Sequence, residues 1–408
     1  MTDKKVQQSA PPATLKRNIS LPLLTFYGLG TILGAGIYVL IGEVVAVSGM
    51  YAPLSFIIAS FLAVFTAFSY AELSARYPKS AGEAVYVEAA FHHPHISLLM
   101  GSLVIMIGLV SSATLANGFV GYLQVFFELP DWLVLVLLIG GLGLIAAWGI
   151  SESVWLATII TLLEVFGLLL IINVSSDALL SVPANLDKLL PEMGEGVWLG
   201  IMMGSFLAFY AYVGFEDMVN VAEEVKNPSH TMPRAIILAL VVSSTLYLLV
   251  ALVSVLSIPL EQLAGNQAPL AHLYQHVSGN KPTVISLISL VAVINGALIQ
   301  IIMASRVLYG LSNQGWLPPI FSRVHPRRHT PLFSTMIVTL LILILALWFP
   351  LVTLAKTTSF VTLIVFAIVN VSLWKIQAKG MSGNNFVPRW VPIVGATVSL
   401  GFLLLQLV

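Results

Sequence analysis

Long runs of apolar residues, separated by short polar segments, fill the sequence from about residue 22 onward. A helix that spans the hydrocarbon core of a bilayer needs about 20 mostly apolar residues. Eleven stretches meet this requirement, with approximate limits 22–42, 52–72, 97–123, 131–149, 153–175, 197–222, 235–258, 283–311, 331–350, 353–374 and 390–407. The runs are continuous rather than alternating, which favours helices over the strands of a membrane barrel. We therefore expect an all-α polytopic membrane protein.

The composition agrees with this class. Hydrophobic residues make up 58% of the chain and charged residues 9%, whereas a soluble domain carries about a quarter charged residues. So few charges cannot cover a water-facing surface, which disfavours a soluble enzyme. Eighteen Lys and Arg balance eighteen Asp and Glu, so no net basic charge attracts nucleic acid. Because the sequence has no cysteine, disulfides and Cys-ligated metals are excluded, and no cofactor is expected.

The positions of Lys and Arg predict the orientation in the membrane. With the N-terminus in the cytoplasm, fifteen of the eighteen fall on inner segments or inner helix ends. This bias is typical of a multi-pass protein of a plasma or inner membrane. Residues 1–21 then form a cytoplasmic tail. The apolar run that follows exceeds a signal peptide's length and has no Ala-x-Ala site, so we expect an uncleaved first span.

Two of the eleven spans are interrupted by small residues. The first has four glycines within residues 28–36, and each costs a helix about 1 kcal/mol relative to alanine. The sixth contains Gly214 near its end. Four intact spans separate the two, which predicts two five-helix sets, 22–175 and an inverted 197–374, with 390–408 as an additional helix. Paired breaks indicate a transporter binding site; close helix packing is the alternative use of such glycines.

Broken helices carry their own binding chemistry. Unwound backbone inside a bilayer is tolerated only where it is buried in protein or lines a cavity. The exposed N–H groups at one half-helix end suit a carboxylate, and the C=O groups at the other suit an ammonium group. An α-amino acid presents both groups, whereas an amine presents only one.

Four stretches also resemble motifs that occur together in one protein family. They are 34–37 in the first span, 72–82 after the second, 209–216 with its continuation to 236 in the sixth, and 305–331 in the eighth span and its exit loop. In this combination the chain resembles the amino acid–polyamine–organocation superfamily of amino acid permeases. The resemblance implies a five-plus-five inverted-repeat core with broken helices 1 and 6, and alternating access. Many members have twelve helices, whereas we expect eleven.

The resemblance also assigns residues to a substrate site. The backbone groups that would hold the substrate carboxylate belong to Gly34, Ala35, Gly36 and Ile37. The carbonyls that would hold the α-amino group belong to Phe209, Tyr210 and Ala211. An aromatic ring at Tyr212 or Phe215 would line or gate the pocket, with ordinary helix packing as the alternative. Further candidate liners of the pocket are Ser111, Ser112 and Asn295.

Glu164, in the fifth span, is the candidate coupling residue. Some proton-coupled members of the superfamily place a lysine in this helix, but the best match to that position here is Glu164. An ionised carboxylate at this depth costs several kcal/mol unless it is hydrated or paired. Burial therefore favours its protonated form and a role in proton coupling; a structural, hydrogen-bonded carboxyl is the alternative. Sodium coupling through paired hydroxyls is poorly supported, because residues 290–303 contain no Ser or Thr.

Other charged residues near the breaks and inner ends have structural interpretations. Glu216 and Asp217 are predicted to cap the second half of the sixth helix, where an acidic group contributes about 0.3–1 kcal/mol; contact with a substrate ammonium is the alternative. Glu72, Arg76 and Arg306 lie at inner helix ends, where snorkelling is the default and an inner-gate salt bridge the alternative. No metal site is expected.

These observations favour a secondary active transporter of amino acids, driven by protons or by exchange. A polyamine or amine permease is the nearest alternative. An intramembrane enzyme is disfavoured, since neither Gly-x-Ser-x-Gly nor His-Glu-x-x-His occurs. A receptor or channel would favour unbroken helices.

Overall fold

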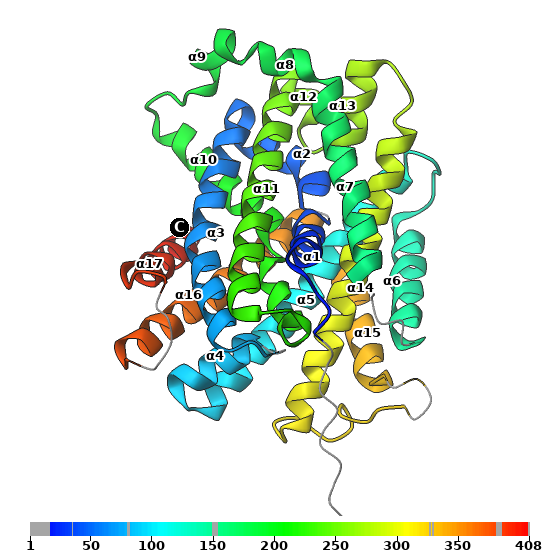
Figure 1. Ribbon diagram of the computed structural model, residues 1–408. Coiled ribbons are helices and arrows are strands. Elements are labelled where there is room, and N and C mark those ends of the chain that lie inside the picture. The colour runs from blue at the N-terminus through cyan, green and yellow to red at the C-terminus, as the bar shows by residue number, and fades with distance from the viewer. Residues whose placement is uncertain are drawn as a thin grey trace, which may run out of the picture.

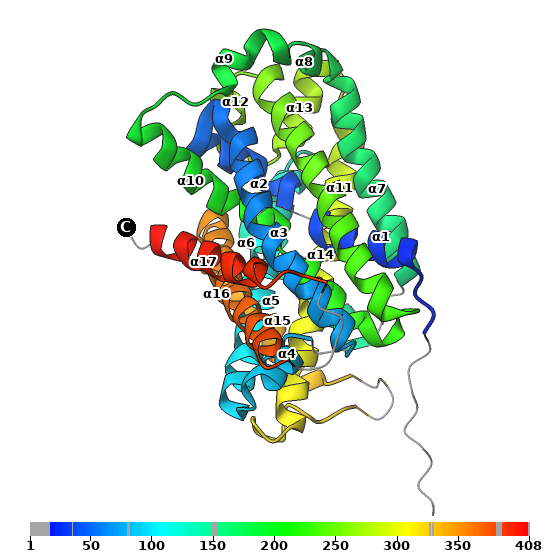
Figure 2. The same ribbon diagram turned by 60° about the vertical axis from the view of Figure 1, so that its left-hand side comes forward.

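The structure, a computed structural model, describes residues 17–34, 36–79, 82–148, 154–325, 328, 330–380 and 386–406. Within these residues the regular elements are helices, together with one isolated parallel bridge. Figure 1 shows the long helices running side by side as a bundle, and Figure 2 shows the same bundle from another side.

The helices follow one another along the chain as α1 (Leu21–Leu33), α2 (Gly36–Ser48), η1 (Gly49–Tyr51), α3 (Ala52–Arg76), α4 (Gly82–Phe91), α5 (Pro94–Leu123), α6 (Asp131–Trp148), α7 (Val154–Val174), α8 (Ser176–Leu180), η2 (Val182–Asn185), α9 (Leu186–Leu189), α10 (Glu195–Phe209), η3 (Tyr210–Tyr212), η4 (Phe215–Glu224), α11 (Pro228–Ser257), α12 (Leu260–Leu263), α13 (Pro269–Ser278), α14 (Thr283–Asn313), α15 (Leu332–Trp348), α16 (Leu351–Ala378) and α17 (Trp390–Leu405).

The helices coincide with the predicted spans. Eight helical segments in the described residues are long and apolar enough to cross a membrane, and the first of them, Leu21–Arg76, contains two predicted spans. The shorter apolar helices α15 and α17 match two further spans. Each of the eleven predicted spans thus has an apolar helix, which confirms an all-α polytopic membrane protein. The predicted limits at 149, 153 and 407 lie outside the described residues.

Proline marks the start of several helices, and apolar side chains cover the outside of the bundle. Proline occupies the first turn of α1, α3, α5 and α11, where its missing N–H has no helical partner to lose. On α6, Leu137 and Leu144 are 63% and 72% exposed. Apolar side chains on the outside of the bundle fit a hydrocarbon surrounding, which offers the backbone no hydrogen bonds and so enforces helices.

The breaks of the two broken helices are buried inside the bundle. The half-helix α1 packs against α7 and α11, whereas α10 packs against α2 and α3. Two long pairs, α5 with α14 and α3 with α11, form the most extensive helix contacts of the bundle. The short helices α8, α9, α12 and α13 gather at one end of the bundle, opposite α4 (Figure 1).

A backbone bridge joins the segments that flank the two broken helices. Ile19, just before α1, pairs with Val225, just after η4. The N–H of Ile19 donates to the carbonyl of Glu224 at 3.0 Å, and the N–H of Lys226 donates to the carbonyl of Ile19 at 2.9 Å. This bridge fixes the start of α1 to the end of η4.

Glu72 connects the end of α3 to α16 and to the segment before α17. Its Oε1 accepts hydrogen bonds from the Arg76 guanidinium and, at 3.0 Å, from the Gln377 amide. Its Oε2 accepts the N–H of Val387 at 2.8 Å. Glu72 is fully buried, so the expected snorkelling to the surface does not occur at this residue. The Arg76–Glu72 ion pair lies within one helix and does not bridge two.

Candidate functional site

The first break separates α1 from α2. The helix α1 ends at Leu33, and the N–H of Gly34 closes it by donating to the carbonyl of Gly30 at 3.1 Å. The next helix begins at Gly36, while Ala35 lies outside the described residues. A Cβ on Gly36 would overlap the Cα of Ala211 in the second break. Only glycine therefore lets the two breaks meet backbone to backbone.

The second break is built from three short pieces. The helix α10 ends at Phe209, a 3₁₀ turn covers Tyr210–Tyr212, and Val213 is extended. Gly214 follows with φ = +130°, and its missing Cβ leaves room for the carbonyl of Thr31 in α1. The carboxylate of Glu216 accepts the N–H of Gly214 at 2.9 Å. Glu216 thus satisfies a backbone donor at the start of η4, as expected of a cap.

Tyr247 of α11 connects the two breaks. Its hydroxyl lies 2.8 Å from the carbonyl of Ile32 and 2.8 Å from that of Ala211. Both carbonyls belong to segments where a helix ends, so they lack partners within a helix. Tyr247 is fully buried and therefore supplies a hydrogen bond at a position that bulk solvent does not reach.

Replacing Tyr247 with phenylalanine should destabilise the protein. Leaving buried carbonyls without a donor costs about 1–3 kcal/mol, which should lower the midpoint of thermal unfolding measured on purified protein in detergent. Tyr274→Phe, at a half-buried tyrosine of α13, is the matched control. Equal unfolding midpoints for the two variants would contradict a bracing role for Tyr247.

A small cavity lies between the two breaks and the helices α5 and α14. It is lined by Thr31, Ile32, Gly34, Gly36, Ser111, Leu115, Tyr210, Val213, Asp217, Gly296, Ile299 and Gln300. The volume of this cavity is about 20 Å³. A single water needs about 10–15 Å³ by this measure, so entry of an amino acid requires the walls to move.

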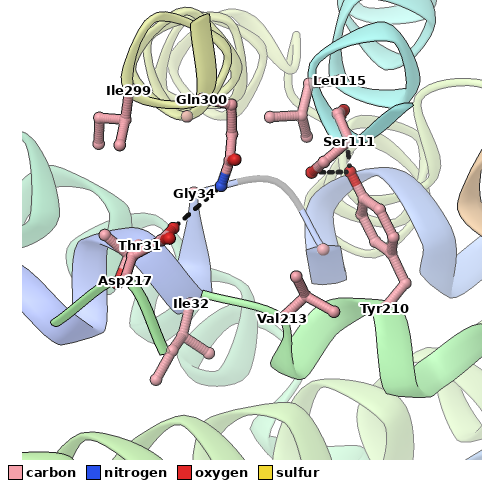
Figure 3. Close-up of a pocket in the computed structure, with 12 residues that line it drawn as sticks. Thr31, Ile32, Gly34, Ser111, Leu115, Tyr210, Val213, Asp217, Ile299 and Gln300 are labelled. Carbon is pink, nitrogen blue, oxygen red and sulfur yellow. Dashed lines mark hydrogen bonds between the residues drawn. The ribbon is translucent and has the colours of Figure 1, made fainter. Parts of the chain in front are cut away.

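Hydroxyl groups line one side of the cavity. The hydroxyls of Ser111 and Tyr210 lie 3.1 Å apart, and that of Tyr210 also lies 3.2 Å from the carbonyl of Ser111 (Figure 3). This contact ties α5 to the second break. The neighbouring Ser112 donates to the carbonyl of Ala297 in α14 at 3.2 Å.

Asp217 and Gln300 face each other across another part of the cavity. The Gln300 amide nitrogen donates to the Asp217 carboxylate at 3.0 Å, and Figure 3 shows Gln300 reaching from α14 toward Asp217 and Thr31. The Oε1 atom of Gln300 is buried and accepts no hydrogen bond within the described residues. The cavity thus contains one carboxylate and one amide oxygen that lacks a donor.

Two further carboxyl groups lie near Asp217. Glu83 of α4 and Glu216 of η4 are both buried, and each is close enough to interact electrostatically with Asp217. The Tyr70 hydroxyl donates to Glu83 at 3.2 Å. Burial, together with the nearby Asp217 charge, raises the pKa of the Glu83 carboxyl to about 7. At neutral pH, Glu83 is therefore protonated in a large fraction of molecules.

Known proteins are similar to this chain across both breaks. The amino acid permease family matches residues 19–408, a range that contains both breaks and the whole cavity lining. The chain belongs to this family.

Individual relatives of this permease carry different names. The branched-chain amino acid permease BcaP of Bacillus subtilis (strain 168) is 28% identical, over 90% of this chain and 82% of the relative. Cationic amino acid transporter 3, mitochondrial, of Arabidopsis thaliana is 30% identical, over 88% of this chain and 62% of the relative. The methylthioribose transporter of Bacillus subtilis (strain 168) is 27% identical, over 96% and 88%. The permease spans less than two thirds of the cationic amino acid transporters that it matches.

The structure brings some of the sequence-predicted site residues together at the cavity. Those that line it are Gly34, Gly36, Ser111 and Tyr210. The others are buried but not among the lining residues, namely Ile37, Phe209, Ala211, Tyr212, Phe215, Ser112 and Asn295. Tyr212 donates to the carbonyl of Phe56 at 3.2 Å, and Phe215 packs edge-on against Tyr70. Both aromatic residues therefore serve helix packing in this conformation.

Glu164 lies on α7, away from the cavity lining. It is fully buried, and its backbone carbonyl accepts the hydroxyl of Tyr38 in α2. The carbonyl of Tyr38 in turn accepts the hydroxyl of Tyr122 in α5 at 2.6 Å. Glu164 is thus connected to α2, the half-helix that begins at the first break.

Sequence reasoning missed several residues that line the cavity. They are Thr31, Ile32, Leu115, Val213, Gly296, Ile299 and Gln300, while Asp217 was predicted mainly as a cap. Gln300 had a usable signal, because an amide inside an apolar helix needs a polar partner. Leu115 and Ile299 had no such signal, because the sequence does not distinguish an apolar side chain that faces a cavity from one that faces lipid.

Proposed function

We propose that this permease is a secondary transporter that moves amino acids across a membrane by alternating access. One observation carries the proposal: the two helix breaks meet at a cavity that residues of both breaks line, Gly34 and Gly36 from the first and Tyr210 and Val213 from the second. Broken helices near the middle of a membrane are the usual way to offer backbone groups to a substrate and a coupling ion.

The geometry supports a specific placement of the amino acid. The first N–H groups of α2, beginning at Gly36, have no helical partners and suit the substrate carboxylate. The carbonyls of the second break suit the ammonium group, although those of Tyr210 and Ala211 already accept the N–H of Val213 and the Tyr247 hydroxyl. Each carbonyl has a second lone pair, so the substrate would share these acceptors.

Packing supports two inverted repeats, 22–175 and 197–374. The first helix of each predicted set packs against the second helix of the other set: α1 against α11, and α10 against α3. Likewise α7 packs against α14, and α16 against α5. Such reciprocal pairs are expected when two sets are related by a two-fold axis in the membrane plane.

The backbone bridge and the cavity size support alternating access. Because Ile19 and Val225 are paired, α1 and η4 would swing together as the inner side opens. The cavity is too small for an amino acid as it stands, so it represents a closed stage of the cycle.

The ends of the chain complete the proposed topology. Residues 1–21 would form a cytoplasmic tail and residues 390–408 an additional helix. The membrane would be a plasma or inner membrane.

A permease for amines is the second candidate. Asp217 favours it, because this carboxylate can pair with an ammonium group, while none of the described residues that line the cavity is a Lys, Arg or His that would pair with a substrate carboxylate. A ligand with only ammonium groups would still find the Asp217 carboxylate and the carbonyls of the breaks.

Uptake into proteoliposomes tests both candidates. Labelled amino acids and polyamines would be presented with and without pH and sodium gradients. We expect saturable uptake of at least one α-amino acid, and competition by other amino acids but not by their carboxamides. Uptake of amines alone would favour the second candidate, and no uptake of any of these compounds would contradict both.

We further propose that Glu164 couples transport to protons. Glu164→Gln should abolish uptake driven by a pH gradient and spare exchange of internal for external substrate, because the amide cannot release a proton. Glu261→Gln in the short helix α12 is the control and should behave as the wild type. If Glu164→Gln leaves the pH dependence of uptake unchanged, this role is contradicted.

A further inference from the structure

Asp217 and Gln300 form a polar pair that the proposed backbone site does not use. They come from different elements, η4 and α14, and are 6% and 7% exposed. Their one mutual hydrogen bond uses a Gln300 N–H, while the Gln300 carbonyl oxygen receives no donor. A buried acceptor without a donor loses the hydrogen bonds that it would form with water. The pair is therefore incomplete by itself and lacks a group that donates hydrogen bonds.

The electrostatics around Asp217 point to a positively charged donor. Asp217, Glu216 and Glu83 interact with one another, and none of them forms an ion pair with a Lys, Arg or His of the described residues. Buried like charges favour neutralisation, by protons or by an external cation. Glu216 is engaged by the N–H of Gly214 and Glu83 by Tyr70, which leaves Asp217 as the carboxylate that reaches the cavity.

We propose that Asp217 and Gln300 form a subsite for an ammonium group of the substrate. The ammonium would donate one hydrogen bond to the Asp217 carboxylate and one to the Gln300 carbonyl oxygen. Its third N–H faces Thr31, which lies beside the pair (Figure 3). An ammonium group has three donors and no acceptor, which matches this set of acceptors. The subsite deepens the proposed function and rests on it.

A metal ion fits the pair less well. No group of three or more His, Cys, Asp or Glu side chains in the described residues is arranged to hold one. An ammonium group forms charge-assisted hydrogen bonds with two or three acceptors, and the chain supplies that number here.

Equilibrium binding tests the subsite on the full-length protein in lipid nanodiscs. The ligands would be L-lysine, L-norleucine, which lacks the side-chain ammonium, and cadaverine, which lacks the carboxylate. Asp217→Asn should weaken the binding of ammonium ligands by at least about tenfold, because a charge-assisted hydrogen bond is lost. Gln300→Met, which keeps the side-chain length, should weaken it by a few-fold. Asp187→Asn in α9 is the matched control and should bind as the wild type.

Two features of the result identify the interaction. If the subsite holds the side-chain ammonium, Asp217→Asn removes the preference for lysine over norleucine; if it holds the α-ammonium, both ligands weaken equally. Glu83→Gln removes a nearby carboxyl without touching the ligand and should change binding by no more than a few-fold. Equal losses in Asp217→Asn and Glu83→Gln would show a general field effect and overturn the subsite.

Protein folding and the proposed function are checked in the same experiment. Asp217→Asn keeps the side-chain shape and removes one of three interacting carboxylates, so its unfolding midpoint should equal or exceed that of the wild type. If the wild type binds the ligands and neither Asp217→Asn nor Gln300→Met changes that binding, the subsite is overturned and the transport proposal still stands. A wild type that binds none of the three ligands would contradict both proposals.

Discussion

Replacing Gly214 with alanine should prevent the permease from folding into a stable form. Gly214 has φ = +130°, which alanine adopts only with strain of about 1–3 kcal/mol. The new Cβ would also overlap the backbone carbonyl of Thr31, and overpacking of this kind costs about 1–3 kcal/mol more. Because the obstacle is backbone, no side-chain rotation relieves it. We expect little monodisperse protein by size-exclusion chromatography and a strongly lowered unfolding midpoint.

Two other glycines separate the causes of this effect. Gly315 has φ = +79° with no atom near its missing Cβ, so Gly315→Ala should show the backbone strain alone. Gly140 lies inside α6, also in open space, and Gly140→Ala should be neutral or stabilising by up to about 1 kcal/mol. If Gly214→Ala is no worse than Gly315→Ala, the close contact of Gly214 with Thr31 of α1 is not essential.

Removing the Glu72 carboxylate should destabilise the protein by about 3–5 kcal/mol, the usual cost of breaking a buried ion pair from one side. Arg76, 7% exposed at its side chain, would keep its charge and lose the ion pair with Glu72. The Gln377 amide and the Val387 N–H would also lose an acceptor. Glu72→Met tests this by thermal unfolding in detergent.

The double variant Glu72→Met with Arg76→Met isolates the ion pair. Removing both groups avoids a buried guanidinium that has lost the Glu72 carboxylate, so the double variant should unfold at a higher temperature than Glu72→Met alone. Glu192→Met, at a polar segment outside the predicted spans, controls for the loss of an acidic side chain. The single variant Arg76→Met completes the comparison. If the loss of stability in the double variant equals the sum of the losses in the two single variants, Arg76 does not depend on Glu72.

Only some residues of the candidate site could be predicted from the sequence. The glycines of the first break and Gly214 stand out because glycine is costly in a helix, and both breaks occur where they indicate. Of the candidate residues, Ser111 and Tyr210 line the cavity. Ala211, in contrast, packs against Gly36, and its carbonyl accepts the Tyr247 hydroxyl. Tyr247 lies more than thirty residues away in sequence, and no local pattern links a tyrosine to a carbonyl in another helix.

The sequence by itself determined the membrane class, the eleven apolar helices and the position of both breaks. It did so because these features depend on local properties: run length, charge content and the cost of glycine in a helix. Only the tertiary structure decided which groups face the cavity, and it brought Asp217 and Gln300 together across 83 residues. The physical reason is that lipid-facing and protein-facing positions of these helices have similar apolar composition, so the sequence pattern alone leaves each helix's rotation about its axis undetermined.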